Sequence, residues 1–209
     1  MAKSTERQRR PRRTAKYRKA RIRHFLLTAG PNALTRGWVN RRHHRAGVVV
    51  REVEIIAPHW PKAFDGIRIG HISDLHVGDL LGVERALDIV GQLRDAAPDM
   101  VCNTGDLVDL HWAGSEPVAK ALGAIKAPMG NFFVLGNHDE LDSGEDVERM
   151  VADAGTTVLH DDVAIVRRGD DVLRVGGIVW ARTPARCQQR IDSALGSESV
   201  DLLLSHNPK

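Results

Sequence analysis

Several features are scarce in this 209-residue chain, and each absence excludes a class of protein. The chain has two cysteines, Cys102 and Cys187, which are too few for a disulfide framework and are typical of a reducing compartment. No apolar run approaches the roughly 20 residues that a membrane-spanning helix needs, and no signal-peptide core follows the basic start. We therefore expect a cytoplasmic protein that is not secreted through a cleaved signal.

Acidic residues are almost missing from the beginning of the chain. Residues 1–45 hold fifteen Lys or Arg and one acid, Glu6, which gives a formal charge of +14, whereas the remainder holds 15 basic and 26 acidic residues, giving −11. A basic segment with little to bury favours disorder. The sequence therefore predicts a basic, largely disordered extension over residues 1–46 and one globular domain over residues 47–209.

A short amphipathic helix is predicted inside this extension, near residues 15–29. Its apolar residues recur at helical spacing: Ile22, Phe25, Leu26 and Ala29. Gly30-Pro31 is predicted to end the helix. Three interpretations stay open: a helix that docks on the domain, a basic helix that touches anionic lipid, and a nucleic-acid contact. An Arg-rich, acid-poor opening is also typical of organelle transit peptides, although the apolar face here is small.

Hydrophobic periodicity in the rest of the chain predicts an α/β fold. Strands are expected at residues 48–56, 67–73, 99–104, 131–135, 157–159, 163–168, 173–179 and 200–205. Helices are expected at residues 82–97, 116–125, 143–154 and 186–195. Strand and helix alternate as far as Gly155, and a hairpin follows, which indicates a layered α/β architecture.

Three polar runs carry the chemistry, and each follows a predicted strand. They are Asp74-Leu75-His76, Gly105-Asp106-Leu107-Val108-Asp109 and Gly136-Asn137-His138-Asp139, about 30 residues apart. Side chains at successive strand ends can converge on one pocket, and carboxylate, imidazole and amide groups bind hard or borderline divalent metals. Any one run alone is a weak signal, but all three in this order predict a two-metal hydrolase.

The order and spelling of these runs resemble the calcineurin-like metallophosphoesterase family, whose pattern is D-x-H, GD-x-x-D, GNH(D/E), a lone His and GH-x-H. The fourth element fits His206, in Ser205-His206-Asn207-Pro208. The fifth is absent, because the chain stops at Lys209. The resemblance implies an α/β two-sheet β-sandwich flanked by helices, the four-layer metallophosphoesterase fold. We expect this domain to be incomplete at its C-terminus.

The resemblance also implies the ligands of two divalent metal ions, with manganese, iron, zinc and magnesium all compatible with such a donor set. Asp106 would bridge the two ions. Asp74 and His76 would complete the first site, and Asn137 and His206 the second. In this family the reaction uses a metal-bridging hydroxide.

Other roles carry over from the same alignment. His138 would act on the substrate phosphate or leaving group as a catalytic residue, and Asp139 would orient its imidazole. Asn137 and His138 would contact substrate, and His111 is a candidate for the border of the substrate cleft. Asp109 and Asn103 are expected to brace the loop around the bridging carboxylate.

The expected activity is therefore metal-dependent hydrolysis of a phosphate ester or pyrophosphate bond in a phosphorylated small molecule or a lipid-linked substrate. A peripheral position at a membrane, through contact by residues 1–45, is compatible with a cytoplasmic location. The alternative is a shortened, weak or inactive remnant whose basic arm binds an anionic membrane surface or, less favoured, nucleic acid.

Overall fold

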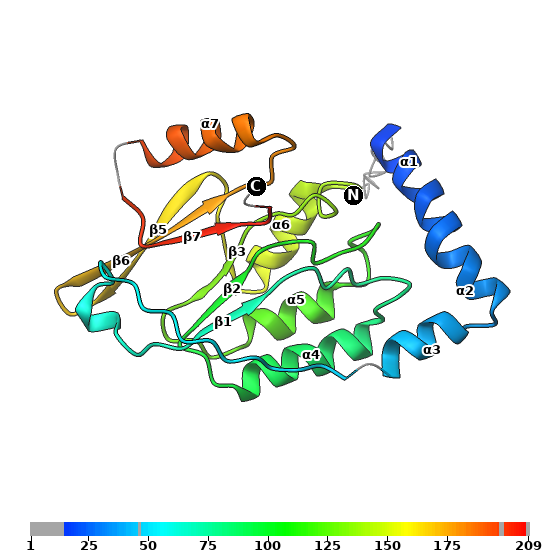
Figure 1. The fold of residues 1–209 in the computed structure, drawn as a ribbon, viewed down its shortest axis with the longest axis horizontal. Helices are drawn as coiled ribbons and strands as arrows, with labels where there is room; N and C mark the ends of the chain where they lie inside the picture. The colour runs from blue at the N-terminus through cyan, green and yellow to red at the C-terminus, as the bar shows by residue number, and fades with distance from the viewer. Residues whose placement is uncertain (1–14, 46, 197–198, 208–209) are drawn as a thin grey trace, which may run out of the picture.

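The computed structural model describes residues 15–45, 47–196 and 199–207 (Figure 1). Of the largely disordered extension predicted over residues 1–46, residues 1–14 and 46 lie outside this described part. Two β-sheets pack face to face with helices on their outer sides, and a helical arm, residues 15–45, stands at one edge of the molecule.

The first sheet is parallel and contains four strands in the order β1-β2-β3-β4. The strands are β1 (Ile69–Ile72), β2 (Met100–Asn103), β3 (Asn131–Phe133) and β4 (Thr157–Val158). The connecting helices are α4 (Val83–Asp95), α5 (Glu116–Gly123) and α6 (Gly144–Asp153). Neighbouring parallel strands need such crossovers, so the alternation in the sequence correctly predicted this half. Ser143 caps α6, because its hydroxyl accepts the Asp146 amide at 3.2 Å.

Alternate residues of the first sheet face two separate cores, as the period of a strand requires. Val101 and Phe133 belong to the core beneath α4, α5 and α6. Met100, Cys102 and Phe132 belong to the core between the two sheets. The strands are therefore covered on both faces, which explains why they read as continuous apolar runs in the sequence.

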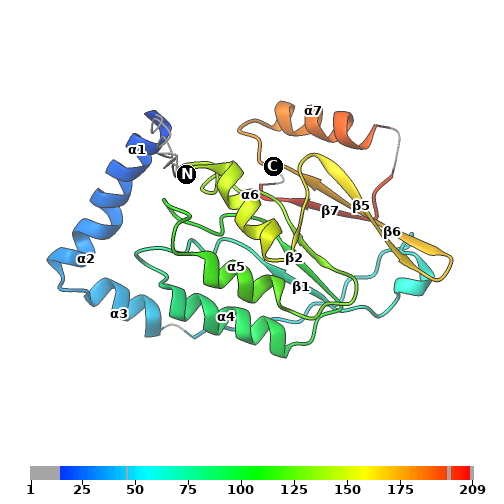
Figure 2. The same cartoon turned by 180° about the vertical axis from the view of Figure 1, so that it is seen from behind.

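The second sheet has the order β5-β6-β7. Its hairpin consists of β5 (Asp162–Arg168) and β6 (Asp171–Ile178), and β7 (Leu202–Ser205) runs parallel to β6. Helix α7 (Pro184–Leu195) covers the side away from the first sheet (Figure 2). The layers are helices, parallel sheet, mixed sheet and helix, which confirms the predicted fold class.

Residues 48–56 were predicted to form a strand, and that prediction is wrong. Residues 47–57 have no regular secondary structure, no strand in the described ranges pairs with them, and Val49, Ile55 and Ile56 are exposed. Alternation of apolar side chains describes two faces of a chain, but a strand also needs a neighbour for its backbone groups. A short 3-10 turn, η2 (Lys62–Phe64), follows and buries Phe64 completely between the sheets.

The arm contains four helical segments: α1 (Ala15–His24), the π-helix η1 (Phe25–Ala29), α2 (Gly30–Leu34) and α3 (Trp38–Arg45). The predicted stop at Gly30-Pro31 is wrong, because the helix continues through it. The Gly30 amide donates to the Phe25 carbonyl and closes a wider π turn. Pro31 follows in the first turn of α2, where its lack of a backbone N–H is tolerated. No helix within the described ranges has the length and apolarity needed to cross a bilayer.

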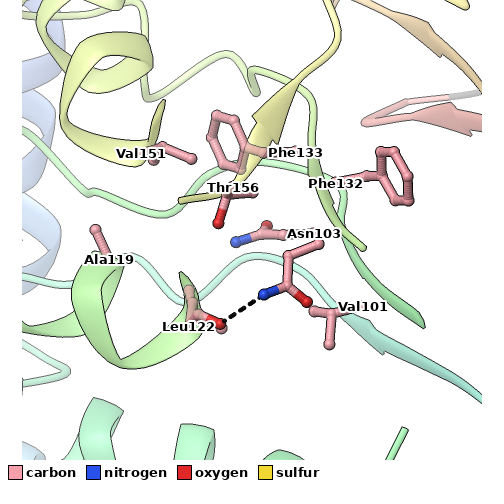
Figure 3. Close-up of a pocket in the computed structure, with 9 residues that line it drawn as sticks. Val101, Asn103, Ala119, Leu122, Phe132, Phe133, Val151 and Thr156 are labelled. Carbon is pink, nitrogen blue, oxygen red and sulfur yellow. Dashed lines mark hydrogen bonds between the residues drawn. The ribbon is translucent and has the colours of Figure 1, made fainter. Parts of the chain in front are cut away.

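The core contains a cavity of about 10 Å³ between the first sheet and helices α5 and α6 (Figure 3). Ala119, Leu122 and Val151 line its helical side. The Asn131 amide at its edge donates to the Leu122 carbonyl at 3.3 Å. Such a volume holds one water at most, so no substrate binds there.

Candidate metal centre at the strand ends

The three polar runs meet at the carboxyl edge of the first sheet, because β1, β2 and β3 are parallel neighbours. Backbone hydrogen bonds tie the first two runs together: the Asp74 amide donates to the Gly105 carbonyl and the His76 amide to the Asp106 carbonyl, each at 2.9 Å. The motifs are therefore parts of one rigid loop cluster.

Asp74, His76 and Asp106 form the first group of potential ligands. His76 Nε2 lies 3.6 Å from Asp74 Oδ1 and 3.5 Å from Asp106 Oδ2. The potential ligand atoms of these three residues lie within 4.8 Å of one another, a spacing that a single ion can span. His76 Nδ1 is buried without a hydrogen-bond partner in the described structure.

His206 approaches the same carboxylate from the second sheet, one residue after β7. Its Nε2 lies 3.4 Å from Asp106 Oδ2, and its Nδ1 lies 2.9 Å from the Thr104 carbonyl. Nδ1 therefore carries a proton and donates it to Thr104, which fixes the ring so that Nε2 points at the cluster. The hydrogen bond to Asp106 raises the pKa of His206 to about 9.

Two imidazoles share one oxygen of Asp106, because its Oδ2 lies 3.5 Å from His76 Nε2 and 3.4 Å from His206 Nε2. It is 2% exposed. Burial opposes its ionisation, but the hydrogen bonds from His206 and from the His138 amide, at 2.7 Å, outweigh burial and lower its pKa. The carboxylate is thus held charged in a buried place.

Backbone strain is concentrated at these ligands. Asp74, His76 and Asp106 have φ values of 54°, 47° and 51°, a left-handed region that non-glycine residues seldom adopt. The second and third runs also touch, since a Cβ on Gly136 would lie 2.3 Å from the Asp106 backbone nitrogen and 2.2 Å from Asp106 Oδ1. Only glycine allows this approach, and the half-buried Asn137 follows it in the chain.

Asp139 does not orient His138, contrary to the expectation from the sequence. Its fully buried carboxylate accepts three backbone amides instead: Asp106 at 2.8 Å, Gly136 at 2.9 Å and Val108 at 3.1 Å. Burial raises the pKa of Asp139 to about 6. Asp139 therefore clamps the second run to the third, and the site's geometry depends on it.

Asp109 contacts the His138 imidazole in its place. His138 Nδ1 lies 2.8 Å from the Asp109 carbonyl oxygen and 3.2 Å from its carboxylate. Burial opposes protonation of His138, but these bonds raise its pKa. Asp109 also lies 4.0 Å from His76, so it borders the site rather than only bracing a loop. Asn103 does brace the loop, through its side-chain oxygen and the Gly105 amide at 3.0 Å.

His24 was not predicted as a site residue, but it reaches this cluster from the arm. Its Nδ1 lies 3.0 Å from the Asp109 carboxylate and its Nε2 lies 2.8 Å from Asp79. His111 also contacts the arm, since its Nε2 lies 2.8 Å from the Tyr17 hydroxyl. Neither contact follows from a local pattern, because each joins residues far apart in the chain.

The donor set fits divalent metal ions. Carboxylate oxygens and imidazole nitrogens converge there, with no Lys or Arg side chain in the described groups. Asp74, His76 and Asp106 would hold one ion, and Asp106, Asn137 and His206 would hold a second. Oxygen and nitrogen donors of this kind suit several divalent metals.

Comparison with known proteins agrees with this geometry. Residues 67–208 match the family model of the calcineurin-like phosphoesterases. A zebrafish (Danio rerio) transmembrane protein with a metallophosphoesterase domain is 32% identical over 76% of this chain and 39% of its own length. The uncharacterized metallophosphoesterase YkuE of Bacillus subtilis is 28% identical over 71% of this chain and 53% of its own length.

A shorter match is to the UDP-2,3-diacylglucosamine pyrophosphatase LpxG of Chlamydia muridarum, 35% identical over 38% of this chain and 25% of that protein. The chain spans about half or less of the length of these relatives. The family match covers the strands and loops that carry every potential metal ligand named above. The chain belongs to the calcineurin-like phosphoesterase family.

Proposed function

We propose that the chain is a metal-dependent hydrolase of phosphate ester or pyrophosphate bonds. The observation that carries the proposal is the convergence of His76 Nε2 and His206 Nε2 on one oxygen, Oδ2, of the buried Asp106 carboxylate. When bound by these residues, two divalent cations would supply Lewis acidity to the phosphoryl oxygens and would lower the pKa of a water nucleophile.

The chain's own residues supply positioning and charge. The two strained loops hold Asp74, His76 and Asp106 before substrate arrives, so that little reorganisation accompanies the reaction. His138 stands beside the cluster, with its ring edge-on to His76 at 4.5 Å between centroids. Asp109 holds the Nδ1 proton of His138. The opposite ring nitrogen is then available to a phosphate or leaving-group oxygen.

The proposed substrate is a phosphorylated small molecule or a lipid-linked phosphate. The name of the chlamydial relative, a pyrophosphatase of a diacylated sugar nucleotide, supports the lipid-linked class. The proposed location is cytoplasmic, with peripheral contact to a membrane through the arm. Asn137 and His111 remain the proposed substrate contacts beside His138.

Release of p-nitrophenol from p-nitrophenyl phosphate and bis(p-nitrophenyl) phosphate, with and without Mn²⁺, tests the activity. We expect Mn²⁺ to stimulate release and Asp106→Asn to abolish it. Asp170→Asn is the matched control, because Asp170 is exposed in the β5–β6 turn. Equal activity of the two variants would refute the assignment of the site.

The alternative is a shortened, weak or inactive remnant whose basic arm binds an anionic membrane surface or nucleic acid. It predicts no Mn²⁺-dependent release from either ester, even from a chain that metal analysis shows to be loaded with Mn²⁺. The release measured from the same loaded sample therefore distinguishes the two functions.

A further inference from the structure

The arm is latched to the edge of the domain that holds the candidate metal centre. Tyr17 is 1% exposed and packs on Leu141 and Leu110. Its hydroxyl contacts His111. His24, about two helical turns further along the arm, contacts Asp109 and Asp79. From α3, the Asn40 side chain donates to the Asp79 carbonyl at 2.8 Å. The arm is therefore fixed relative to the site.

The contacts of Tyr17 and His24 with the domain, called the latch below, lie on a different face of the helix from the predicted apolar stripe. Tyr17, Ala20 and His24 contact the domain, whereas Ile22, Phe25 and Leu26 of the predicted apolar stripe are exposed. Ile22 lies two residues from both Ala20 and His24, which is roughly 200° around an α-helix. The arm's outer face consists of Ile22, Phe25, Leu26 and Leu27, which are 61%, 63%, 62% and 72% exposed.

The charge of the arm restricts what this face binds. Residues 15–45 hold nine Lys or Arg and no acidic residue. Arg18, Lys19, Arg21 and Arg23 are exposed on the same helix as the outer face. A helix that combines exposed large apolar side chains with basic neighbours matches the interface of an anionic bilayer. Nucleic acid offers phosphates to the basic residues but no apolar phase for four aliphatic and aromatic side chains.

The arm lies where a bilayer could approach it. In both views α1 stands at the outer edge of the molecule, on the side where the strand-end loops lie (Figures 1 and 2). We propose that the arm's outer face binds anionic membrane, and that the Tyr17 and His24 latch thereby holds the strand-end site beside the lipid headgroups. The membrane binding stands independently, whereas the consequence that the substrate is a bilayer-resident phosphate rests on the proposed function.

Co-sedimentation of the full chain with vesicles tests the proposal. We expect binding to phosphatidylcholine vesicles that contain a quarter phosphatidylglycerol, and at least tenfold weaker binding in 0.5 M NaCl or to pure phosphatidylcholine. Phe25→Ser/Leu26→Ser is expected to weaken binding roughly tenfold per residue, because each side chain loses its transfer from water to lipid.

Ile165→Ser/Leu203→Ser is the matched control, since these side chains are 53% and 40% exposed on the second sheet, away from the arm. It should bind vesicles as the wild type does. Circular dichroism and melting curves check that each variant is folded. Wild-type binding that does not need phosphatidylglycerol, or an outer-face variant that binds like the control, would overturn the proposal.

Two further outcomes distinguish membrane binding from nucleic-acid binding and from the proposed phosphoesterase activity. Tight binding to single-stranded DNA that Phe25→Ser/Leu26→Ser leaves unchanged, without vesicle binding, would identify the arm as a nucleic-acid surface and refute the membrane role. Hydrolysis of p-nitrophenyl phosphate is measured on the same samples. Hydrolysis without vesicle binding refutes only the membrane proposal, and vesicle binding without hydrolysis refutes only the phosphoesterase proposal.

Discussion

Asp139→Ala separates two roles for this carboxylate, a clamp between loops and an orienting partner of His138. In the structure it accepts the amides of Asp106, Gly136 and Val108 and makes no hydrogen bond to His138. Removing it leaves three buried N–H groups without an acceptor. The main consequence should therefore be lost stability and a displaced metal centre.

The magnitude follows from the three amides. A buried donor left unpaired costs roughly 1–3 kcal/mol, so three cost at least about 3 kcal/mol. The lower bound is the better expectation. Burial raises the pKa of Asp139 to about 6, so the folded protein already pays a desolvation cost for the charged carboxylate, and removing the side chain relieves that cost. Asp139→Asn keeps one acceptor oxygen in place of Oδ2, which serves Asp106 and Gly136, and loses only the Val108 bond, at about 1 kcal/mol.

Urea unfolding followed by circular dichroism measures both losses, with Asp170→Ala as the exposed control. We expect the order wild type, Asp139→Asn and Asp139→Ala, and no change in the control beyond about 0.5 kcal/mol. If Asp139→Ala loses less than about 1 kcal/mol while phosphoesterase activity disappears, the clamp is refuted and the orienting role is restored.

Three further predictions follow from the packing. Gly136→Ala should weaken Mn²⁺ binding at least tenfold, because its Cβ would lie 2.2 Å from the Asp106 carboxylate and must displace it; isothermal titration measures this. Burial raises the pKa of the Cys102 thiol to about 12, so a disulfide reagent at pH 8 should label only the half-buried Cys187 until urea is added. Tyr17→Ala should release the arm, because losing a buried aromatic costs about 3 kcal/mol; trypsin should then cleave the arm at least tenfold faster.

One result would contradict each of these three predictions. Unchanged Mn²⁺ affinity in Gly136→Ala would mean that the two loops do not touch as described. Two reactive thiols in the native protein would contradict the burial of Cys102. Tryptic cleavage of Tyr17→Ala no faster than that of Leu27→Ala, whose side chain is exposed, would show that the arm is not latched through Tyr17.

The sequence predicted the parallel half of the fold well because its signals are local. Each strand is covered on both faces and reads as a short apolar run, and each crossover helix shows a clear stripe. Residues 48–56 show the limit of this reasoning. Their alternation is that of a strand, but pairing depends on a distant neighbour, and the described structure places none beside them.

The site was predicted as far as motif order allows. Asp74, His76, Asp106 and His206 converge, because parallel neighbours place their carboxyl ends together and β7 brings its histidine to the same edge. The exchange of roles between Asp139 and Asp109 could not be predicted, since both carboxylates lie close to the cluster and only loop geometry selects their partners. The contacts of Tyr17 and His24 are long-range, and no spacing in the sequence indicates them.

Metal stoichiometry tests the central claim most directly. Purified chain loaded anaerobically with Mn²⁺ and freed of excess metal should carry two ions and give the electron paramagnetic resonance spectrum of a coupled pair. Asp106→Asn should carry at most one ion and lose the coupling, while Asp170→Asn should match the wild type. A wild-type chain that retains no manganese, or an Asp106→Asn chain with two coupled ions, would contradict a metal centre bridged by Asp106.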